Sequence, residues 1–202
     1  IMTFFLLSFI MIYLSIYEPG YRNISILDLS DYPAGIWTWE SPIFTYESEE
    51  RLYISQNGKG KMLKAVIPFS ENYLGFGIDK KVVLDPAALL EITWKGEGRT
   101  PYIQIDIIDG KGMTENPDSG EIFSVITKMP GNEWQKDKYR ITSFERNRHQ
   151  EEFRPNTGNL NWDNVLQLEF TFAPGTDLEL DIKSIDYSWG VFKWDYIIML
   201  SF

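Results

Sequence analysis

A period of two in hydrophobicity, repeated through the middle of the chain, limits the fold more than any other feature of the sequence. In residues 102–107 an isoleucine occupies every second position, and polar or aromatic side chains fill the positions between. Residues 90–95, 166–172 and 178–183 alternate in the same way. This spacing is typical of a β-strand with one face in the core and one in solvent. These segments are therefore predicted to be strands that pack against a common core.

Shorter apolar runs between turn-forming residues predict the other strands. Asn57-Gly58 is the strongest hairpin signal, and Pro174-Gly175 marks a further turn. No segment within residues 22–190 carries a helical stripe of apolar residues. We therefore expect an all-β fold, an antiparallel β-sandwich that occupies residues 22–190 as one domain. The further strands are expected at residues 36–46, 52–56, 61–68, 75–84, 122–127 and 134–141.

The two ends of the chain are apolar, in contrast to this polar middle. Residues 1–17 contain no charged side chain and reach the lower limit of length for crossing a bilayer core of about 30 Å. Residues 1–21 are predicted to be a transmembrane helix or signal anchor, with a truncated signal sequence as the alternative. Residues 191–202 are interpreted as the start of a second membrane helix or as a tail. Trp189, Trp194 and Tyr196 then suit the membrane interface.

Composition restricts the partners and the chemistry. The chain carries 29 acidic and 19 basic residues, a net charge of −10, which argues against nucleic acid or an anionic lipid surface as the main partner. Cysteine is absent, and His149 is the only histidine, so a metal site based on histidine would have one imidazole. Carboxylate pairs such as Glu91 with Glu169 belong to no catalytic motif. We predict that the chain is not an enzyme.

The C-terminal half resembles a known family in three successive segments. A strand led by Trp134 runs into Ser143-Phe144, a small polar turn follows at Trp162-Asp163-Asn164, and Asp181 lies in the last strand. In this succession the chain is similar to the galactose-binding-like β-sandwich domains. These include jelly-roll carbohydrate-binding modules and the domain of complex I intermediate-associated proteins. The resemblance extends over residues 36–188, and it implies a jelly roll that binds a ligand.

The outward-facing positions of the predicted strands carry side chains that suit a glycan. Aromatic faces stack on sugar rings, while amides, carboxylates and arginine hydrogen-bond to hydroxyls. These residues would share one face if their strands are neighbours, and the alternative is the ordinary solvated face of a sandwich. Trp37 and Trp39 also share a strand face; we interpret them as core, with a stacking platform as the alternative. The candidate ligand-binding residues are Tyr102, Gln104, Asp106, Arg140, Gln167 and Glu169.

No motif requires a cofactor, and calcium is the one ion for which ligands can be named. Glu40 and Asp181 are the candidate metal ligands, because the ends of resembling domains pair and calcium takes carboxylate oxygens. Asp181-Ile-Lys183 departs from the adjacent acidic residues of many relatives, which argues against a site of the family type. Residues 110–120 and 143–161 are predicted to be loops, and the second is a candidate rim for a binding site.

Two classes of function follow from these features. The first is a non-catalytic, membrane-tethered ligand-binding module outside the cytoplasm, with carbohydrate as the expected ligand. The second is a sensory or structural domain of a larger membrane protein, held between two membrane helices. An assembly or chaperone domain acting through protein contacts is a further alternative, and it requires an exposed apolar patch.

Overall fold

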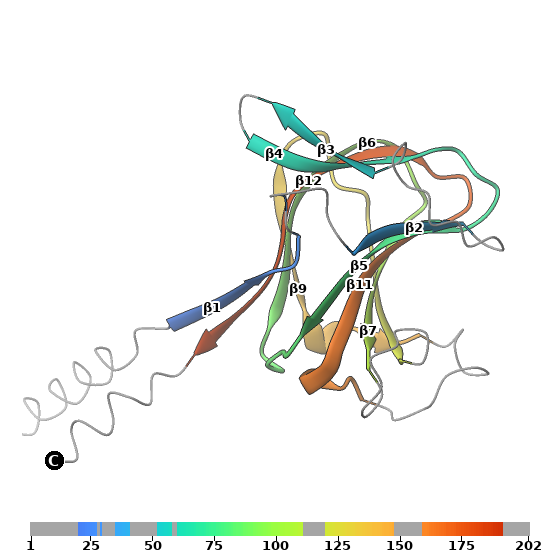
Figure 1. Cartoon of the computed structure of the whole chain (residues 1–202). Coiled ribbons are helices and arrows are strands. Elements are labelled where there is room, and N and C mark those ends of the chain that lie inside the picture. Colours follow the sequence, from blue (N-terminus) through green and yellow to red (C-terminus); the bar gives the residue numbers. More distant parts are fainter. Residues whose placement is uncertain are drawn as a thin grey trace, which may run out of the picture.

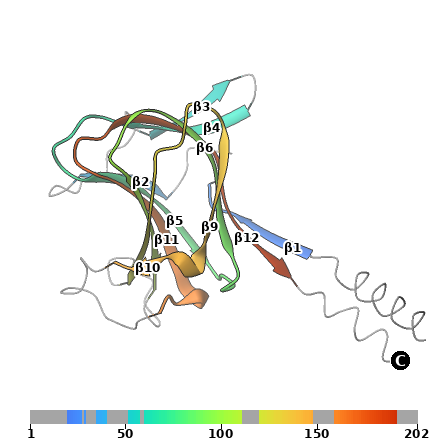
Figure 2. The same ribbon diagram turned by 180° about the vertical axis from the view of Figure 1, so that it is seen from behind.

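The computed structural model describes residues 20–27, 29, 35–40, 52–57, 60–110, 120–147 and 159–191. Within these ranges the chain forms two antiparallel sheets that face each other, as Figure 1 and its reverse view in Figure 2 show. The element order alternates irregularly between the sheets, as in a jelly roll. The predicted all-β sandwich is confirmed.

The first sheet, sheet A, has β12 and β6 at its centre. Its strand order is β3-β4-β12-β6-β9, and β1 also pairs with β12, on the far part of that strand. The β3–β4 hairpin pairs Asn57 with Gly60, which confirms the turn predicted at Asn57-Gly58. The strands are β1 (Gly20–Ser25), β3 (Leu52–Asn57), β4 (Gly60–Ile67), β6 (Leu89–Arg99), β9 (Gln135–Arg140) and β12 (Asp177–Val191).

The second sheet, sheet B, has the order β10-β8-β7-β11-β5-β2. All its pairings are antiparallel, and β11 contacts both β7 and β5 along most of its length. Two short 3₁₀ turns, Ile141–Ser143 and Trp162–Asn164, precede strands of this sheet. The strands are β2 (Ile36–Glu40), β5 (Leu74–Val82), β7 (Ile103–Asp109), β8 (Ile122–Thr127), β10 (Glu145–Arg146) and β11 (Val165–Phe172).

The core lies between the two sheets and contains the apolar residues of each alternating segment. The isoleucines of β7, the aromatic residues of β11 and the inward side chains of β6 are almost fully buried. Phe76 of β5 stacks on Phe170 of β11 with ring centroids 4.7 Å apart. Trp94 is buried in this core as predicted, and its indole Nε1 donates to Asp137 at 2.6 Å. In β6, β7 and β11 the sequence period therefore reports correctly which face of the strand is inside.

The last strand is longer than its sequence period indicates, because it contains a bulge. The register of β12 against β6 shifts between Ile182 and Ser184. Before the shift the buried residues include Leu180 and Ile182, whereas after it they include Ile185 and Tyr187. A bulge inserts one residue into a strand, and every later side chain then changes face. The predicted strand at residues 178–183 thus covers only the first part of β12.

The membrane predictions fall largely on residues outside the described ranges. No helix among the described residues is long and apolar enough to cross a membrane. The anchor was predicted over residues 1–21 and the second membrane segment over residues 191–202, of which residues 1–19 and 192–202 are not described. Gly20 and Tyr21 lie in β1 and Val191 lies in β12, so the predicted bounds are wrong at these three residues. Trp189 is described and is 8% exposed within the core cluster. Its burial among core residues contradicts the place predicted for it in an interfacial aromatic belt.

Candidate functional site

The outer face of sheet B brings together aromatic, amide and carboxylate side chains from five of its six strands, including β2 at one edge. Strand pairing arranges them in rows across the sheet. One row runs from Trp37 through Gly77 and Glu169 to Asp106 and Ser124. We refer to this surface as the sheet B face. Its residues are Trp37 and Trp39 on β2, Gly75, Gly77 and Asp79 on β5, Gln167, Glu169 and Thr171 on β11, Gln104 and Asp106 on β7, and Ser124 and Ile126 on β8.

The two tryptophans lie above a stripe of glycines. A Cβ atom on Gly77 would come 2.5 Å from Cζ2 of Trp37, and one on Gly75 would come 2.8 Å from Nε1 of Trp39. Side chains at these positions would clash with the indoles, so the glycines allow both rings to pack directly against the backbone of the sheet. Trp37 and Trp39 are half-buried on the outer face. Their interpretation as core is wrong, and the stacking-platform alternative describes their position.

Asp79 connects the tryptophan side of this face to its amide side. Its Oδ1 accepts hydrogen bonds from Nε1 of Trp37 and from Nε2 of Gln167, each at 3.0 Å. Gln167 is only 3% exposed, so its amide has a fixed orientation. The Asp79 carboxylate therefore holds one aromatic and one amide group at a defined separation.

Asp106 is the centre of a second polar network on the same face. Nε2 of Gln104 donates to both of its oxygens, at 2.9 and 3.0 Å, and Thr171 donates at 3.0 Å. Ser124 donates to it as well, and Asn147 donates to the Ser124 hydroxyl at 3.1 Å. Burial raises the pKa of Asp106, although these neutral donors partly offset the effect. The network fixes Gln104, Thr171 and Ser124 relative to one another.

Tyr102 lies at one end of this face, just before β7. A hydrogen bond with Tyr73 is the main reason that the pKa of Tyr102 is raised, with burial second. Tyr73 precedes β5 and is 46% exposed. The two tyrosines thus add aromatic surface at the end of the face where β5 and β7 begin.

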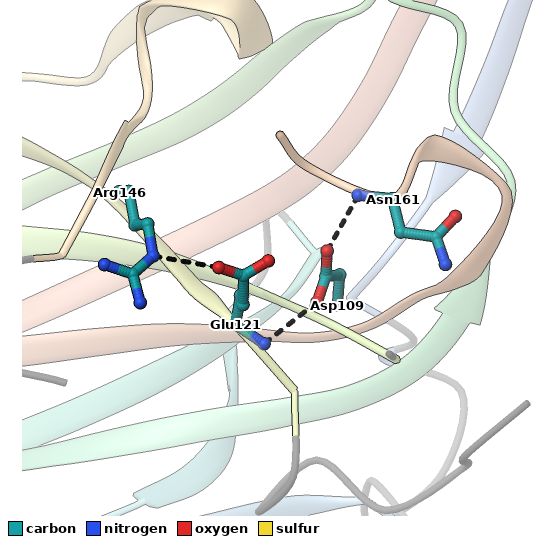
Figure 3. A network of polar contacts seen from close by, with 4 residues as sticks. All are labelled: Asp109, Glu121, Arg146 and Asn161. Atoms are coloured by element: carbon teal, nitrogen blue, oxygen red, sulfur yellow. Dashed lines mark hydrogen bonds and ion pairs between the residues drawn. The ribbon is translucent and has the colours of Figure 1, made fainter. Parts of the chain in front are cut away.

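A buried network of polar contacts that includes one ion pair lies at the opposite end, where β7 ends (Figure 3). Asp109 accepts from the backbone N–H of Glu121 at 2.9 Å and of Asn161 at 2.7 Å. Nε of Arg146 donates to Glu121 at 2.8 Å, and Glu121 is 1% exposed. Burial is the first cause of a raised pKa at Asp109. These residues join the stems of the two predicted loops, whose own residues 111–119 and 148–158 are not described.

Arg140 does not belong to the sheet B face. It is exposed on β9, at the edge of sheet A, whereas the other candidate residues lie on or beside β7 and β11 of sheet B. The predicted grouping of Arg140 with them is therefore wrong, since the period of two gives the face of a strand but not its sheet. Gln104, Asp106, Gln167 and Glu169 do share one face, and Tyr102 flanks it.

The outer face of sheet A differs from the sheet B face, because its charged side chains form ion pairs with one another. Glu91 is held between Lys136 at 2.5 Å and Lys138 at 2.6 Å. Burial would raise the pKa of Glu91, but the two ammonium groups outweigh it and the pKa is lowered. Glu91 and Glu169 lie in different sheets, so this pair cannot flank one glycosidic bond.

The candidate metal ligands are also on different sheets. Glu40 is the last residue of β2 in sheet B, and its side chain is not described. Asp181 is on β12 in sheet A and is paired with Lys95 at 2.9 Å. Among the described residues, no three His, Cys, Asp or Glu side chains gather in a way that could hold a metal ion. The calcium site stays a prediction without a described ligand group. His149 lies outside the described residues.

Sequence comparison provides no assignment for the chain. No family model matches it. No match is found among curated proteins. Comparison of structures, in contrast, finds carbohydrate-binding modules.

Three of the similar structures are modules of Clostridium thermocellum. A family 11 carbohydrate-binding module of a cellulosomal cellulase matches with a TM-score of 0.64 and 16% identity, over 86% of this chain and 96% of the module. A family 11 module in complex with a β-1,3-1,4-mixed-linked tetrasaccharide matches with a TM-score of 0.62 and 15% identity, over 84% and 95%. A family 30 module of a cellulosomal cellulase matches with a TM-score of 0.61 and 12% identity, over 82% and 96%. The chain therefore has the jelly-roll fold of these modules, as its sequence resemblance predicts.

Proposed function

We propose that this chain is a non-catalytic carbohydrate-binding module and that the sheet B face is its glycan site. The observation that carries the proposal is the pair of indoles seated over Gly75 and Gly77, beside amides fixed by Asp79 and Asp106. Aromatic rings supply apolar contact for the faces of sugar rings, and oriented amides select the hydroxyl pattern. The likeness in fold to solved carbohydrate-binding modules supports this proposal.

The charge of the face indicates which glycans it would accept. Asp79 and Glu169 place two carboxylates on this surface, whereas Asp106 is buried beneath it and adds no exposed charge. Carboxylates accept hydrogen bonds from sugar hydroxyls but repel uronate and sulfate groups. We therefore expect neutral glycans to bind and anionic polysaccharides to be rejected. A β-1,3-1,4-mixed-linked tetrasaccharide, the ligand of one similar module, is a suitable first probe.

The proposal assigns no catalytic residue. Glycoside hydrolysis requires two carboxyl groups at a defined separation across the scissile bond. Both oxygens of Asp106 already accept hydrogen bonds from neighbouring side chains, and Asp79 positions Trp37 and Gln167. These carboxylates act as positioning groups, and binding is the activity that they serve.

Calorimetric titration of the full chain in detergent micelles with the tetrasaccharide tests this site. Trp37→Ala should weaken binding by about 2 kcal/mol, roughly 30-fold, because an aromatic contact with the sugar is lost. Trp134→Ala is the matched control, since this half-buried indole lies in sheet A's outer surface, with the ammonium of Lys183 3.8 Å from its ring centroid. Equal losses in the two variants, or unchanged binding in Trp37→Ala, would contradict the proposal.

We further propose that the module is tethered to a membrane and displayed outside the cytoplasm. The support is in the sequence, where residues 1–17 are uncharged and apolar. Flotation of the full chain with vesicles tests the tether, because a chain held by hydrophobic insertion resists high salt and alkaline carbonate. Release by either treatment would count against it. The sensory and assembly alternatives stay predictions.

A further inference from the structure

The first and last described strands form a two-stranded ribbon that brings the two ends of the described fold together. β1 pairs with the far part of β12 in antiparallel register, and the outermost pair is Gly20 with Val191. β6 accompanies β12 only as far as Ser188, so the final residues of the ribbon extend beyond the sheet. Figure 1 shows this ribbon leaving the sandwich at one end. Residues 1–19 and 192–202 are therefore attached to neighbouring backbone positions.

The ribbon is fixed to the sandwich and is not a free arm. The backbone N–H of Ile26 donates to Ile185 at 2.7 Å, immediately after β1. Ile26 and Leu27 are buried in the core cluster, and Nζ of Lys80 donates to the carbonyl of Ser25 at 2.7 Å. The direction in which the ribbon leaves the fold is therefore set by packing and hydrogen bonds at its base.

The sequence on the two sides of the ribbon is similar in character. Tyr17 comes three residues before Gly20, and Trp194 comes three residues after Val191. Apolar runs lie beyond each aromatic residue, at residues 1–16 and 197–202. Tyrosine and tryptophan prefer the boundary between lipid tails and water. In the sequence, an apolar segment thus flanks each end of the ribbon, with an aromatic residue three positions from the last strand pair on both sides.

We propose that the β1–β12 ribbon is a stalk that delivers both flanking segments to the same face of one lipid bilayer, at one point. Two adjacent apolar segments anchor more strongly than one, because their transfer free energies add for a single molecule. The proposal does not depend on glycan binding. It adds to the single N-terminal tether a second attachment and a fixed geometry.

The stalk also orients the candidate glycan site. β12 runs from Asp177 to Val191, which is about 46 Å at 3.3 Å per residue. The turn before Asp177 contacts the β4–β5 loop, since the N–H of Gly175 donates to Ser70 at 2.8 Å. Tyr73 follows in that loop, at the end of the sandwich opposite to the stalk. The tyrosine end of the sheet B face is therefore held away from the bilayer.

Depth-dependent fluorescence quenching tests the proposal on the full chain, which has no cysteine of its own. Single-site variants Tyr17→Cys, Trp194→Cys and Asn72→Cys are labelled with an environment-sensitive fluorophore and reconstituted into phosphatidylcholine vesicles. Spin-labelled lipid with the quencher near the headgroup should quench the probes at positions 17 and 194 to the same extent. The probe at position 72, an exposed site in the β4–β5 loop, should not be quenched.

A disulfide verifies that the ribbon exists in the membrane-bound chain. Asn23 and Ser188 are direct partners in the ribbon, and paired positions in adjacent strands lie within disulfide range. The double variant Asn23→Cys/Ser188→Cys should cross-link completely on mild oxidation in vesicles. Asn23→Cys/Glu179→Cys is the matched control, because Glu179 lies near the other end of β12, and it should form no intrachain bond.

Each outcome decides the proposal. Equal quenching at positions 17 and 194 with a formed ribbon disulfide supports it. Quenching at only one of the two positions, at neither, or at position 72 as well would overturn it, as would failure of the ribbon to cross-link. Titration of the same vesicles with the tetrasaccharide tests the glycan site separately. If the tetrasaccharide still binds while quenching is lost, the stalk proposal is overturned and the proposed glycan-binding function is retained.

Discussion

The carboxylates on the two outer faces of the sandwich lie in opposite kinds of environment. On sheet A, Glu91 receives two lysine ammonium groups, and its pKa is lowered. On sheet B, Asp106 is buried and accepts hydrogen bonds from neutral amide and hydroxyl groups, and its pKa is raised. The first arrangement neutralises charge at a solvated surface. The second fixes neutral polar groups around a costly buried acid, which is a pattern found at functional sites more than at ordinary surfaces.

The aromatic residues of the two faces differ in the same sense. Trp134, on the sheet A side, lies under the ammonium groups of Lys95 and Lys183, so protein cations already lie over its ring. Trp37 and Trp39 lie over glycines and beside polar side chains on sheet B. On sheet A the charged side chains pair with one another and are already satisfied. On sheet B the indoles and the oriented amides form a preorganised surface that a ligand can contact. This contrast is the main argument for placing the glycan site on sheet B.

The largest expected effect concerns the ion pair that supports the sheet B face. Arg146→Met should destabilise the fold by about 3 kcal/mol, because it leaves the buried Glu121 carboxylate without the cation in its pair. On sheet A, Lys138→Met removes one of the two cations paired with Glu91. The Lys138 side chain is 55% exposed, so this substitution should lower the free energy of unfolding by less than about 1 kcal/mol. Urea unfolding of the full chain in detergent measures both. Similar losses would show that the two faces do not differ in this respect.

A smaller effect is expected from filling the glycine stripe. Gly77→Ala places a methyl group against the Trp37 indole and should cost about 1–3 kcal/mol or displace the ring. Affinity for the tetrasaccharide should fall with it. Gly131→Ala on the sheet A side is the control, because the nearest atom to its new Cβ is 3.9 Å away. A neutral result for Gly77→Ala would mean that the indole is not seated on this strand.

The sequence predicted the faces of strands better than it predicted their neighbours. Alternation placed Gln104 and Asp106 outward on β7 because each faces away from buried isoleucines. It could not show that Arg140 lies in the other sheet, since strand order depends on tertiary packing. The bulge near Lys183 reverses the alternation of β12, and for this reason the second part of that strand was not predicted. β1 was missed because its residues border the apolar segment and carry little alternation of their own.

One signal for the tryptophan platform was present in the sequence and could have been used. Residues 74–78 alternate glycine with Leu, Phe and Ile. Glycine at every second position of a strand leaves one face without side chains, which marks a place where another group lies close to the backbone. The identity of that group, Trp37 and Trp39, required the pairing of β2 with β5. The networks around Asp106 and Glu121 required the full topology.

The smallest expected effect is a difference in pH dependence between the two carboxylates. The raised pKa of Asp106 means that its contribution to stability is full below the unfolded-state pKa of about 3.9 and is lost as pH rises through the folded-state pKa. The lowered pKa of Glu91 means that its contribution, about 0.5 kcal/mol, is present above a pH of about 4.3 and is lost as pH falls. The two terms therefore have opposite signs in acid.

Unfolding free energies of the unmodified chain, Asp106→Asn and Glu91→Gln across acidic pH would separate these terms. The advantage of the unmodified chain over Glu91→Gln should grow as pH rises, and its advantage over Asp106→Asn should shrink. Parallel trends would show that the two faces do not hold their carboxylates differently.

The most direct test of the glycan site is a nuclear magnetic resonance titration of the full chain with the mixed-linked tetrasaccharide and other neutral glycans. The indole N–H signals report each tryptophan separately. We predict that the signals of Trp37 and Trp39 shift on binding while that of Trp134 stays in place. A shift of Trp134 without the other two, or a folded sample in which no neutral glycan moves Trp37 or Trp39, would contradict the assignment of the site to sheet B.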